Sequence, residues 1–239
     1  MGNIRPDVRF GRIRYPAQRR RTAFTIHKPP DRKEPTMNEV EKSSPTRRRI
    51  LEAVIACIEK EGINNLTTRS IAAEAGVNIA AINYYFRTKD ALVEEALTMS
   101  INHMLEDITA ILGDQNQPFN TRLEEAFFYL VDGAYAFPGT FMAHLYSPVV
   151  ERRYDTVGAQ AMLKVFRMLI DHAIQAFPQQ DAADVKLAIY QIVGSVLFTM
   201  LSPGFLQELL LFQLTEQSDR RQYAHYLAHA VIHQLQGQG

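Results

Sequence analysis

Basic side chains that could bind phosphate gather in two parts of the sequence. The chain has no formal net charge, with 26 Lys and Arg against 26 Asp and Glu. Residues 1–36 nevertheless hold ten basic and three acidic side chains, a net charge of +7 that the acidic remainder balances. Within that remainder, basic side chains cluster at Arg47, Arg48, Arg49, Arg69, Arg87 and Lys89. Such a cluster usually is a solvated face, but here it coincides with a helix pattern that favours contact with nucleic acid.

A predicted helix at 79–86 presents side chains that could read bases. On a period of 3.6 residues, Ile82 and Phe86 point toward a core. The outward positions are Ile79, Ala80, Asn83 and Tyr84. In the major groove an amide can pair with adenine, and apolar tips favour the thymine methyl group. The alternative for Tyr84, and for its neighbour Tyr85, is packing on adjacent helices, because paired aromatics at a helix end often pack in this way.

Two preceding helices must position that segment. Ser44 is expected to cap the first, with Pro45 at its first position, and Gly62 to end it. Its core stripe is Leu51, Val54, Ile55 and Ile58.

The second helix starts at a cap supplied by Thr67 or Thr68. Gly76 provides the backbone freedom for a tight turn, and Asn78 caps the third helix. This succession is typical of a helix-turn-helix, which places its second helix in the major groove of DNA.

These residues resemble the DNA-binding domain of TetR-type transcriptional regulators. The resemblance is carried by residues 66–77 (LTTRSIAAEAGV), 82–86 (INYYF) and 89–92 (KDAL). Beyond Leu92 it lies only in length and helical pattern, so it implies an architecture there and not a ligand.

The resemblance also implies roles for single residues. Thr68, Tyr85 and Lys89 match positions that contact the DNA backbone, and Arg69 matches a position that in some members reaches guanine. The full expected DNA-binding set is Arg47, Arg48, Thr68, Arg69, Asn78, Ile79, Ala80, Asn83, Tyr84, Tyr85 and Lys89.

Two departures from the family concern the recognition helix. Asn83 stands where the family usually has a tyrosine that contacts phosphate, so we expect Asn83 to read adenine instead. Ile79, Ala80 and Ala81 are apolar where many members have polar groups.

Composition excludes several classes of protein. No run of eighteen apolar residues and no apolar signal core is present, so we expect a cytoplasmic protein with no membrane span. Cys57 is the single cysteine and is read as a small buried hydrophobe. No phosphate loop, metal signature or nucleophile elbow occurs, so we expect no enzyme and no cofactor.

Residues 1–43 contain five prolines, repeated arginines and no helical or strand period. They are expected to form a disordered basic tail that adds non-specific affinity for DNA. The alternative is that translation begins at Met37.

The rest of the chain is predicted to be all-α, as a helix-turn-helix domain at 44–92 and a larger helical domain at 93–239 that binds an effector and dimerises. Breaks are expected at Gly113-Asp114, Pro138-Gly139, Ser147-Pro148, Pro178 and Ser202-Pro203-Gly204. The predicted helices are 89–112, 120–137, 140–145, 155–177, 181–201, 205–211 and 219–236.

Two apolar stripes near the carboxyl end suit the four-helix dimer interface that the resemblance implies. The first is Val185, Ala188, Ile189, Ile192, Val196 and Met200, beside the small Gly194 and Ser195; the second is Tyr223, Leu227, Ala230 and Val231. The alternative is an ordinary core within one chain.

Aromatic and methionine side chains in the middle of the chain could line an apolar effector pocket, although each fits a filled core equally well. The candidates are Phe128, Tyr135, Met142, Tyr146, Phe166 and Phe198. A histidine row, His225, His229 and His233, is read as an interface rim or solvated face rather than a metal site.

The sequence therefore predicts a homodimeric regulator that binds a palindromic double-stranded operator, a repressor released by a small, mainly apolar effector. The alternative is a DNA-binding protein of the same fold that answers to a protein partner.

Overall fold

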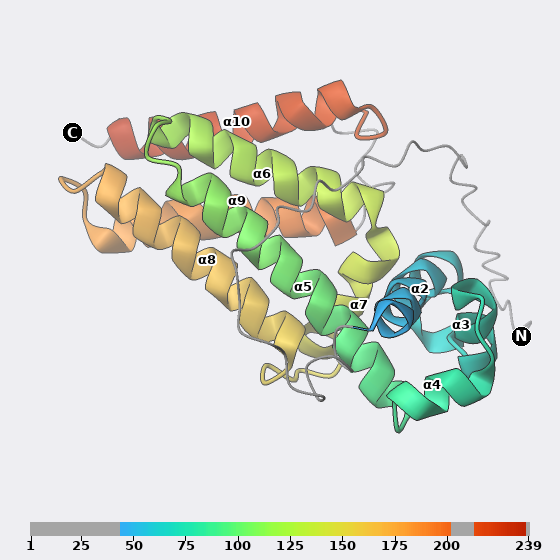
Figure 1. Cartoon of the computed structure of the whole chain (residues 1–239). Coiled ribbons are helices and arrows are strands. Elements are labelled where there is room, and N and C mark those ends of the chain that lie inside the picture. The colour runs from blue at the N-terminus through green and yellow to red at the C-terminus, as the bar shows by residue number, and fades with distance from the viewer. Residues whose placement is uncertain (1–43, 202–212, 238–239) are drawn as a thin grey trace, which may run out of the picture. The chain divides into compact units, whose positions relative to one another are not determined.

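The computed structural model describes residues 44–201 and 213–237, and the secondary-structure elements of this part of the chain are all helices (Figure 1). The predicted tail at 1–43 and the predicted helix at 205–211 lie outside the described residues. The elements are α2 (Pro45–Glu61), the 3-10 helix η1 (Ile63–Asn65), α3 (Thr68–Ala75), α4 (Ile79–Tyr85), α5 (Lys89–Gly113), α6 (Phe119–Ala136), α7 (Pro138–Val149), α8 (Val157–Ala176), α9 (Ala182–Leu201) and α10 (Gln217–Gln236). The expected all-α fold class is confirmed.

Helices α2, α3 and α4 and the start of α5 enclose the smaller of two hydrophobic cores. Ile50, Ile58 and Ile71 are fully buried there. Leu92 and Ala96 contribute from α5, and the same core takes in one residue from α7, which is Ala143. The expected domain boundaries at 43 and 92 stay predictions, since α5 runs across the second one.

The local start and stop signals lie where the sequence predicts them, with one difference. Thr67, not Thr68, caps α3, and Gly62 ends α2 with a φ of 78°. Ser44 occupies the capping position of α2, but its side chain makes no cap hydrogen bond. Its hydroxyl instead lies 3.0 Å from the hydroxyl of Tyr85.

The larger core lies among α5, α6, α8, α9 and α10, with α10 packed along α6 and α9. Most residues of the two stripes that we assigned to a dimer interface lie in this core: Val185, Ile189 and Leu227 are buried within the chain, whereas Ala230 is exposed. That assignment was wrong, and the alternative of an intrachain core holds. The reason is that α9 is apolar on most of its circumference, so periodicity alone cannot distinguish the face buried within the chain from the face left exposed.

Helix α9 is also long and apolar enough to cross a membrane by length and composition, a test that core helices of soluble proteins pass as well.

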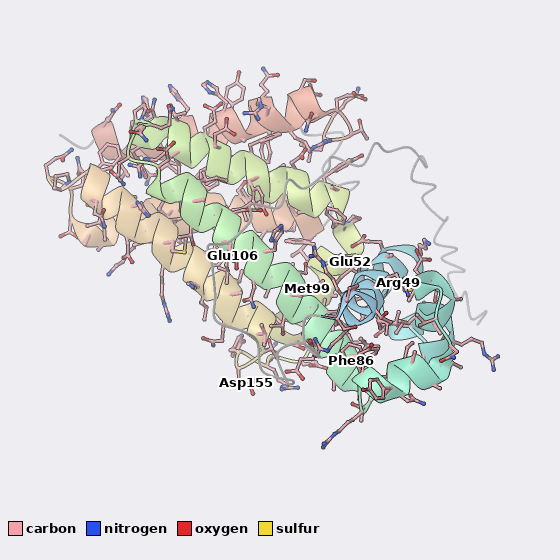
Figure 2. All side chains as sticks on the ribbon, viewed as in Figure 1. Arg49, Glu52, Phe86, Met99, Glu106 and Asp155 are labelled. Atoms are coloured by element: carbon pink, nitrogen blue, oxygen red, sulfur yellow. The ribbon has the colours of Figure 1, made fainter. Side chains whose placement is uncertain are left out.

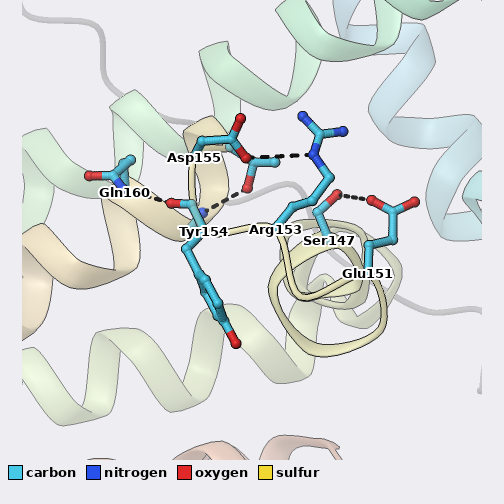
Figure 3. Close-up of polar contacts among 8 residues, drawn as sticks. Ser147, Glu151, Arg153, Tyr154, Asp155 and Gln160 are labelled. Carbon is cyan, nitrogen blue, oxygen red and sulfur yellow. Dashed lines mark hydrogen bonds and ion pairs between the residues drawn. The ribbon is translucent and has the colours of Figure 1, made fainter.

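The expected break at Ser147-Pro148 was also wrong, because α7 continues through Pro148 to Val149. A proline has a helical φ, and this one lies in the last turn, where its missing N–H costs a single backbone hydrogen bond. The connection to α8 follows. Figure 3 shows the Ser147 hydroxyl donating to Glu151 and the Gln160 amide donating to the Tyr154 carbonyl in this connection.

Candidate nucleic-acid interface

Helices α3 and α4 form a helix-turn-helix whose boundaries are fixed locally. The Thr67 hydroxyl accepts from the Ser70 N–H at 3.0 Å, and the Ser70 hydroxyl accepts from the Thr67 N–H at 3.2 Å. Gly76 ends α3 with a left-handed φ of 62°. The Asn78 side-chain oxygen accepts from the Ala81 N–H at 2.8 Å and so begins α4. These caps and the glycine set the direction of α4 relative to α3.

The two faces of α4 lie as the periodicity predicts. Ile82 and Phe86 are buried in the smaller core and anchor the helix. The outward positions are all exposed, at Ile79, Ala80, Asn83 and Tyr84. In a helix-turn-helix, the side chains at such positions of the second helix are the ones that face the major groove. Their contact with bases stays a prediction.

Tyr85 turns toward the protein. Its ring packs against the smaller core and lies edge-on to Tyr84, with 5.0 Å between ring centroids. Its hydroxyl lies 3.0 Å from that of Ser44. Packing, the alternative that the sequence left open for Tyr85, therefore occurs, and its expected contact with the DNA backbone stays a prediction.

Two of the expected cations are bound to the protein itself. The Arg47 guanidinium donates to both oxygens of Glu95, at 2.6 and 2.5 Å, and lies over the ring of Phe86. The Lys89 ammonium donates to the Leu66 carbonyl at 3.1 Å, just before α3. Lys89 thereby joins the start of α5 to the start of α3, and it remains exposed there.

The remaining cations lie at the surface. Arg48 pairs with Glu52 one turn along α2, an exposed pair of little energetic consequence. Figure 2 shows Arg49 on α2, and Arg69 is exposed near the start of α3, directly after the half-buried Thr68. Arg49, Arg69 and Arg87, the last of them just after α4, are thus exposed arginines that a nucleic acid can reach.

The six expected effector residues do not share one buried cluster. Phe128 and Tyr135 pack against the larger core and also face arginines of α10, with Arg221 3.8 Å from the Phe128 centroid and Arg220 4.4 Å from the Tyr135 centroid. Phe166 packs against the same core. The other three, Met142, Tyr146 and Phe198, are exposed in the described chain.

The histidine row on α10 is exposed. The His225 ring lies 6.2 Å from that of His229, which lies 6.3 Å from that of His233, and His225 contacts Glu124 at 2.8 Å. Among the described residues no group of three ligands could hold a metal ion.

Cys57 is buried in α2, and burial, with a further contribution from Glu61, raises the pKa of its thiol. A thiol of this kind stays protonated at neutral pH and is a poor nucleophile.

Sequence reasoning missed two residues. Glu59 of α2 caps the amino-terminal end of α7, and the only signal was the Pro138-Gly139 pair, which we read as a break rather than as a helix start in need of a cap. His144 is half-buried, its Nε2 atom is enclosed without a hydrogen-bond partner, and burial lowers the pKa of this imidazole to about 4. A lone histidine in a helix gives no sequence signal for either property.

Known proteins resemble this chain most closely in the helix-turn-helix. Residues 50–96 match the family model of bacterial regulatory proteins of the tetR family. The transcriptional regulator BetI of Cronobacter sakazakii is 38% identical over 64 residues, and that of Brucella canis is 30% identical over 82 residues. The BetI match covers 27% of this chain and 31% of the Cronobacter protein, so the chain spans about a third of the length of such relatives.

Solved structures extend the likeness in fold beyond the helix-turn-helix to most of the chain. The regulator FadR of Bacillus subtilis, in complex with stearoyl-CoA, superposes with a TM-score of 0.57 at 14% identity, over 77% of this chain and 97% of FadR. A TetR transcription regulator from Haloarcula marismortui gives 0.57 at 22% identity, over 77% and 97%. At such identities the likeness concerns the fold alone. These relatives are transcriptional regulators rather than enzymes.

Proposed function

This chain belongs to the TetR family of bacterial regulatory proteins, and on that premise we propose that it is a dimeric cytoplasmic regulator that binds a palindromic operator. It acts as a repressor that a small, mainly apolar effector releases. The observation that carries the proposal is the exposed outer face of α4, four side chains on a helix that is capped at its start and anchored by buried residues. Phosphate contacts fix the register of such a helix, and its side chains read the bases.

The dimer is supported by an exposed apolar row on α9. Leu187 and Phe198 are each 51% exposed and Tyr190 is 73% exposed, on a helix whose opposite side is buried at Val185, Ile189 and Val196. Gly194 lies between them, and a Cβ placed there would have no described atom within 4 Å. On α10, Tyr226 is also exposed. A second copy would remove this apolar area from water and would bring the two α4 helices to the two halves of an inverted repeat.

An apolar effector is supported by the aromatic and methionine residues of the middle helices. Phe128, Tyr135 and Phe166 pack on the larger core and offer apolar surface to a ligand, with Arg221 and Arg220 over the rings of the first two. FadR of B. subtilis, whose fold is similar, holds stearoyl-CoA, a molecule with a long apolar chain.

A second candidate is control by a protein partner. It is favoured by the exposed apolar row Met142, Tyr146 and Val149, which recur at helical spacing on α7. Rows of this kind on a protein surface often mark contacts with other proteins.

The experiment that tests base reading compares two kinds of DNA. Arg69→Ala and Asn83→Ala should each weaken binding to the selected operator by about 1–3 kcal/mol and relax the preference at one base pair per half-site. Lys89→Ala should weaken binding to the operator and to random duplex alike. Equal losses on both duplexes for Arg69→Ala and Asn83→Ala would remove the base-reading role, and a protein with no preferred sequence would contradict the proposed function as a whole.

A further inference from the structure

The amino-terminal end of α7 is capped by a side chain from the helix-turn-helix domain. Pro138, the first residue of α7, has no N–H, and Phe137 before it makes no side-chain cap. Glu59, near the end of α2, fills that position with both carboxylate oxygens. They accept from the Gly139 N–H at 2.9 Å, from the Thr140 N–H at 2.6 Å and from the Thr140 hydroxyl at 2.5 Å. A carboxylate is also the group that the positive end of a helix dipole favours.

Close packing adds to this cap. A Cβ on Gly139 would lie 2.8 Å from the Ile58 carbonyl oxygen and 3.1 Å from the Glu59 Cα, so the two helices approach to a distance that only glycine permits. Thr140 is 5% exposed, and Ala143, one turn later, is buried in the smaller core. Figure 1 shows α7 lying beside α2. Three successive contact points thus fasten the start of α7 to α2.

The other side of α7 packs on the larger domain. A Cβ on Gly158 of α8 would lie 2.9 Å from the His144 carbonyl oxygen, so α7 approaches α8 as closely as it approaches α2. Helices α5 and α6 also contact α7. Because packed interiors transmit displacements rather than absorb them, a shift of α7 must carry α2 with it for as long as the contact at Glu59 holds.

We propose that Glu59 is a positioning residue that holds the helix-turn-helix domain on α7, so that this carboxylate fixes the separation of the two recognition helices in the dimer. This inference rests on the proposed function, since it concerns two copies bound to one operator. Glu59 acts through its contact with α7 and not through a contact with DNA. Its effect is to hold the two helix-turn-helix domains of the dimer at one spacing and one relative rotation.

The dependence of DNA affinity on the spacing between half-sites measures how rigidly the two recognition helices are held. Each inserted base pair moves one half-site by about 3.4 Å and rotates it by about a tenth of a turn. With the full chain, we expect one inserted or deleted pair to weaken binding by at least about tenfold, which corresponds to about 1.4 kcal/mol. Glu59→Gln keeps the shape of the side chain but removes the charge and one acceptor, and we expect the same change in spacing to cost it less than about threefold.

Two further variants keep the test sharp. Thr140→Val removes the hydroxyl donor from the other side of the same contact, and it should flatten the spacing dependence in the same direction even if Glu59→Gln folds poorly. Glu61→Gln neutralises an exposed glutamate on the same helix and should leave the spacing dependence unchanged. Hydrogen exchange at the Gly139 and Thr140 amides should accelerate in Glu59→Gln but not in Glu61→Gln. This measurement detects loss of the Glu59 cap in the protein without DNA.

The outcomes separate the inference from the function beneath it. If the unaltered protein prefers one spacing and both Glu59→Gln and Thr140→Val keep the same steep dependence, Glu59 does not set the separation of the recognition helices. If the unaltered protein shows no preference for paired half-sites, the proposed dimeric operator binding fails, whatever hydrogen exchange reports about the cap.

Discussion

The guanidinium of Arg47 lies over the ring of Phe86, with 4.9 Å between its Cζ and the ring centroid. Phe86 ends α4 and is buried, and the same guanidinium donates to both oxygens of Glu95 on α5. A cation expected to bind phosphate therefore joins three helices around the end of the recognition helix. Its role is distinguishable from that of Arg49, two residues later and exposed.

Arg47→Ala should lower the free energy of unfolding by about 1–2 kcal/mol, because it removes a paired charge and a cation–π contact. Arg49→Ala should leave the free energy of unfolding unchanged and reduce the salt dependence of DNA binding by about one unit of slope if Arg49 touches a phosphate. Urea unfolding and binding titrations at several salt concentrations check both. The opposite pattern, with Arg47→Ala fully stable and its salt slope reduced, would return Arg47 to the DNA-contacting set.

Two glycines give a matched pair for the contact between α2 and α7. Gly139→Ala should destabilise the protein by about 1–3 kcal/mol, because the added methyl meets the Ile58 backbone, which cannot move aside cheaply. Gly133→Ala, in α6, meets no atom within 4 Å and should raise the free energy of unfolding by up to about 1 kcal/mol, since alanine costs less entropy in a helix. Thermal and urea unfolding measure both, and a neutral Gly139→Ala would mean that the two helices separate easily.

The sequence predicted the helix-turn-helix in detail because its signals are local. Thr67, Gly76 and Asn78 each act on a backbone group within a few residues, so the residue type suffices to place a cap or a turn. The outward face of α4 followed from periodicity for the same reason.

The remaining features depend on partners far along the chain. Glu59 contacts Thr140, 81 positions further along the chain, and Arg47 contacts Glu95, 48 positions further along. No pattern in the sequence identifies the partner of either charge. On α9, Ile189 and Tyr190 are adjacent and both apolar in character, yet one is 1% and the other 73% exposed. Composition cannot distinguish a face that is buried within the chain from one that is left exposed.

That exposed face of α9 leads to a prediction about the dimer. Tyr190→Glu should release monomers and raise the dissociation constant at least about thirtyfold, because an unpaired charge in an apolar interface costs about 2 kcal/mol or more. The fold should survive, since Tyr190 is exposed in the single chain. Leu227→Glu, which places a charge in the core, should instead unfold the protein.

Sedimentation and circular dichroism distinguish the two effects, and Gln175→Glu on the exposed side of α8 serves as the control. An intact dimer in Tyr190→Glu would place the interface on another surface.

The last prediction concerns acid stability and His144. Burial lowers the pKa of this imidazole from 6.5 to about 4. In the unfolded chain His144 takes up a proton near pH 6.5, whereas in the folded chain it stays neutral until about pH 4. The unfolded state therefore binds more protons between these values, and the free energy of unfolding falls as the pH falls from 6.5 to 4. Between pH 6.5 and pH 4, His144 lowers the free energy of unfolding by about 3 kcal/mol in all. Above pH 6.5 this loss of stability is absent.

His144→Leu should remove that part of the pH dependence, and it also removes a buried Nε2 that has no hydrogen-bond partner, so the variant should be at least as stable as the parent at pH 5. His172 needs its own control, because burial and the nearby Arg122 lower its pKa as well. Urea unfolding of the parent, His144→Leu and His172→Gln at about pH 4.5, 5.5 and 7.5 separates the contributions of the two histidines to the free energy of unfolding. If the parent and His144→Leu lose stability in parallel over that range, His144 is protonated in the folded protein and the helices around it open more readily than their packing indicates.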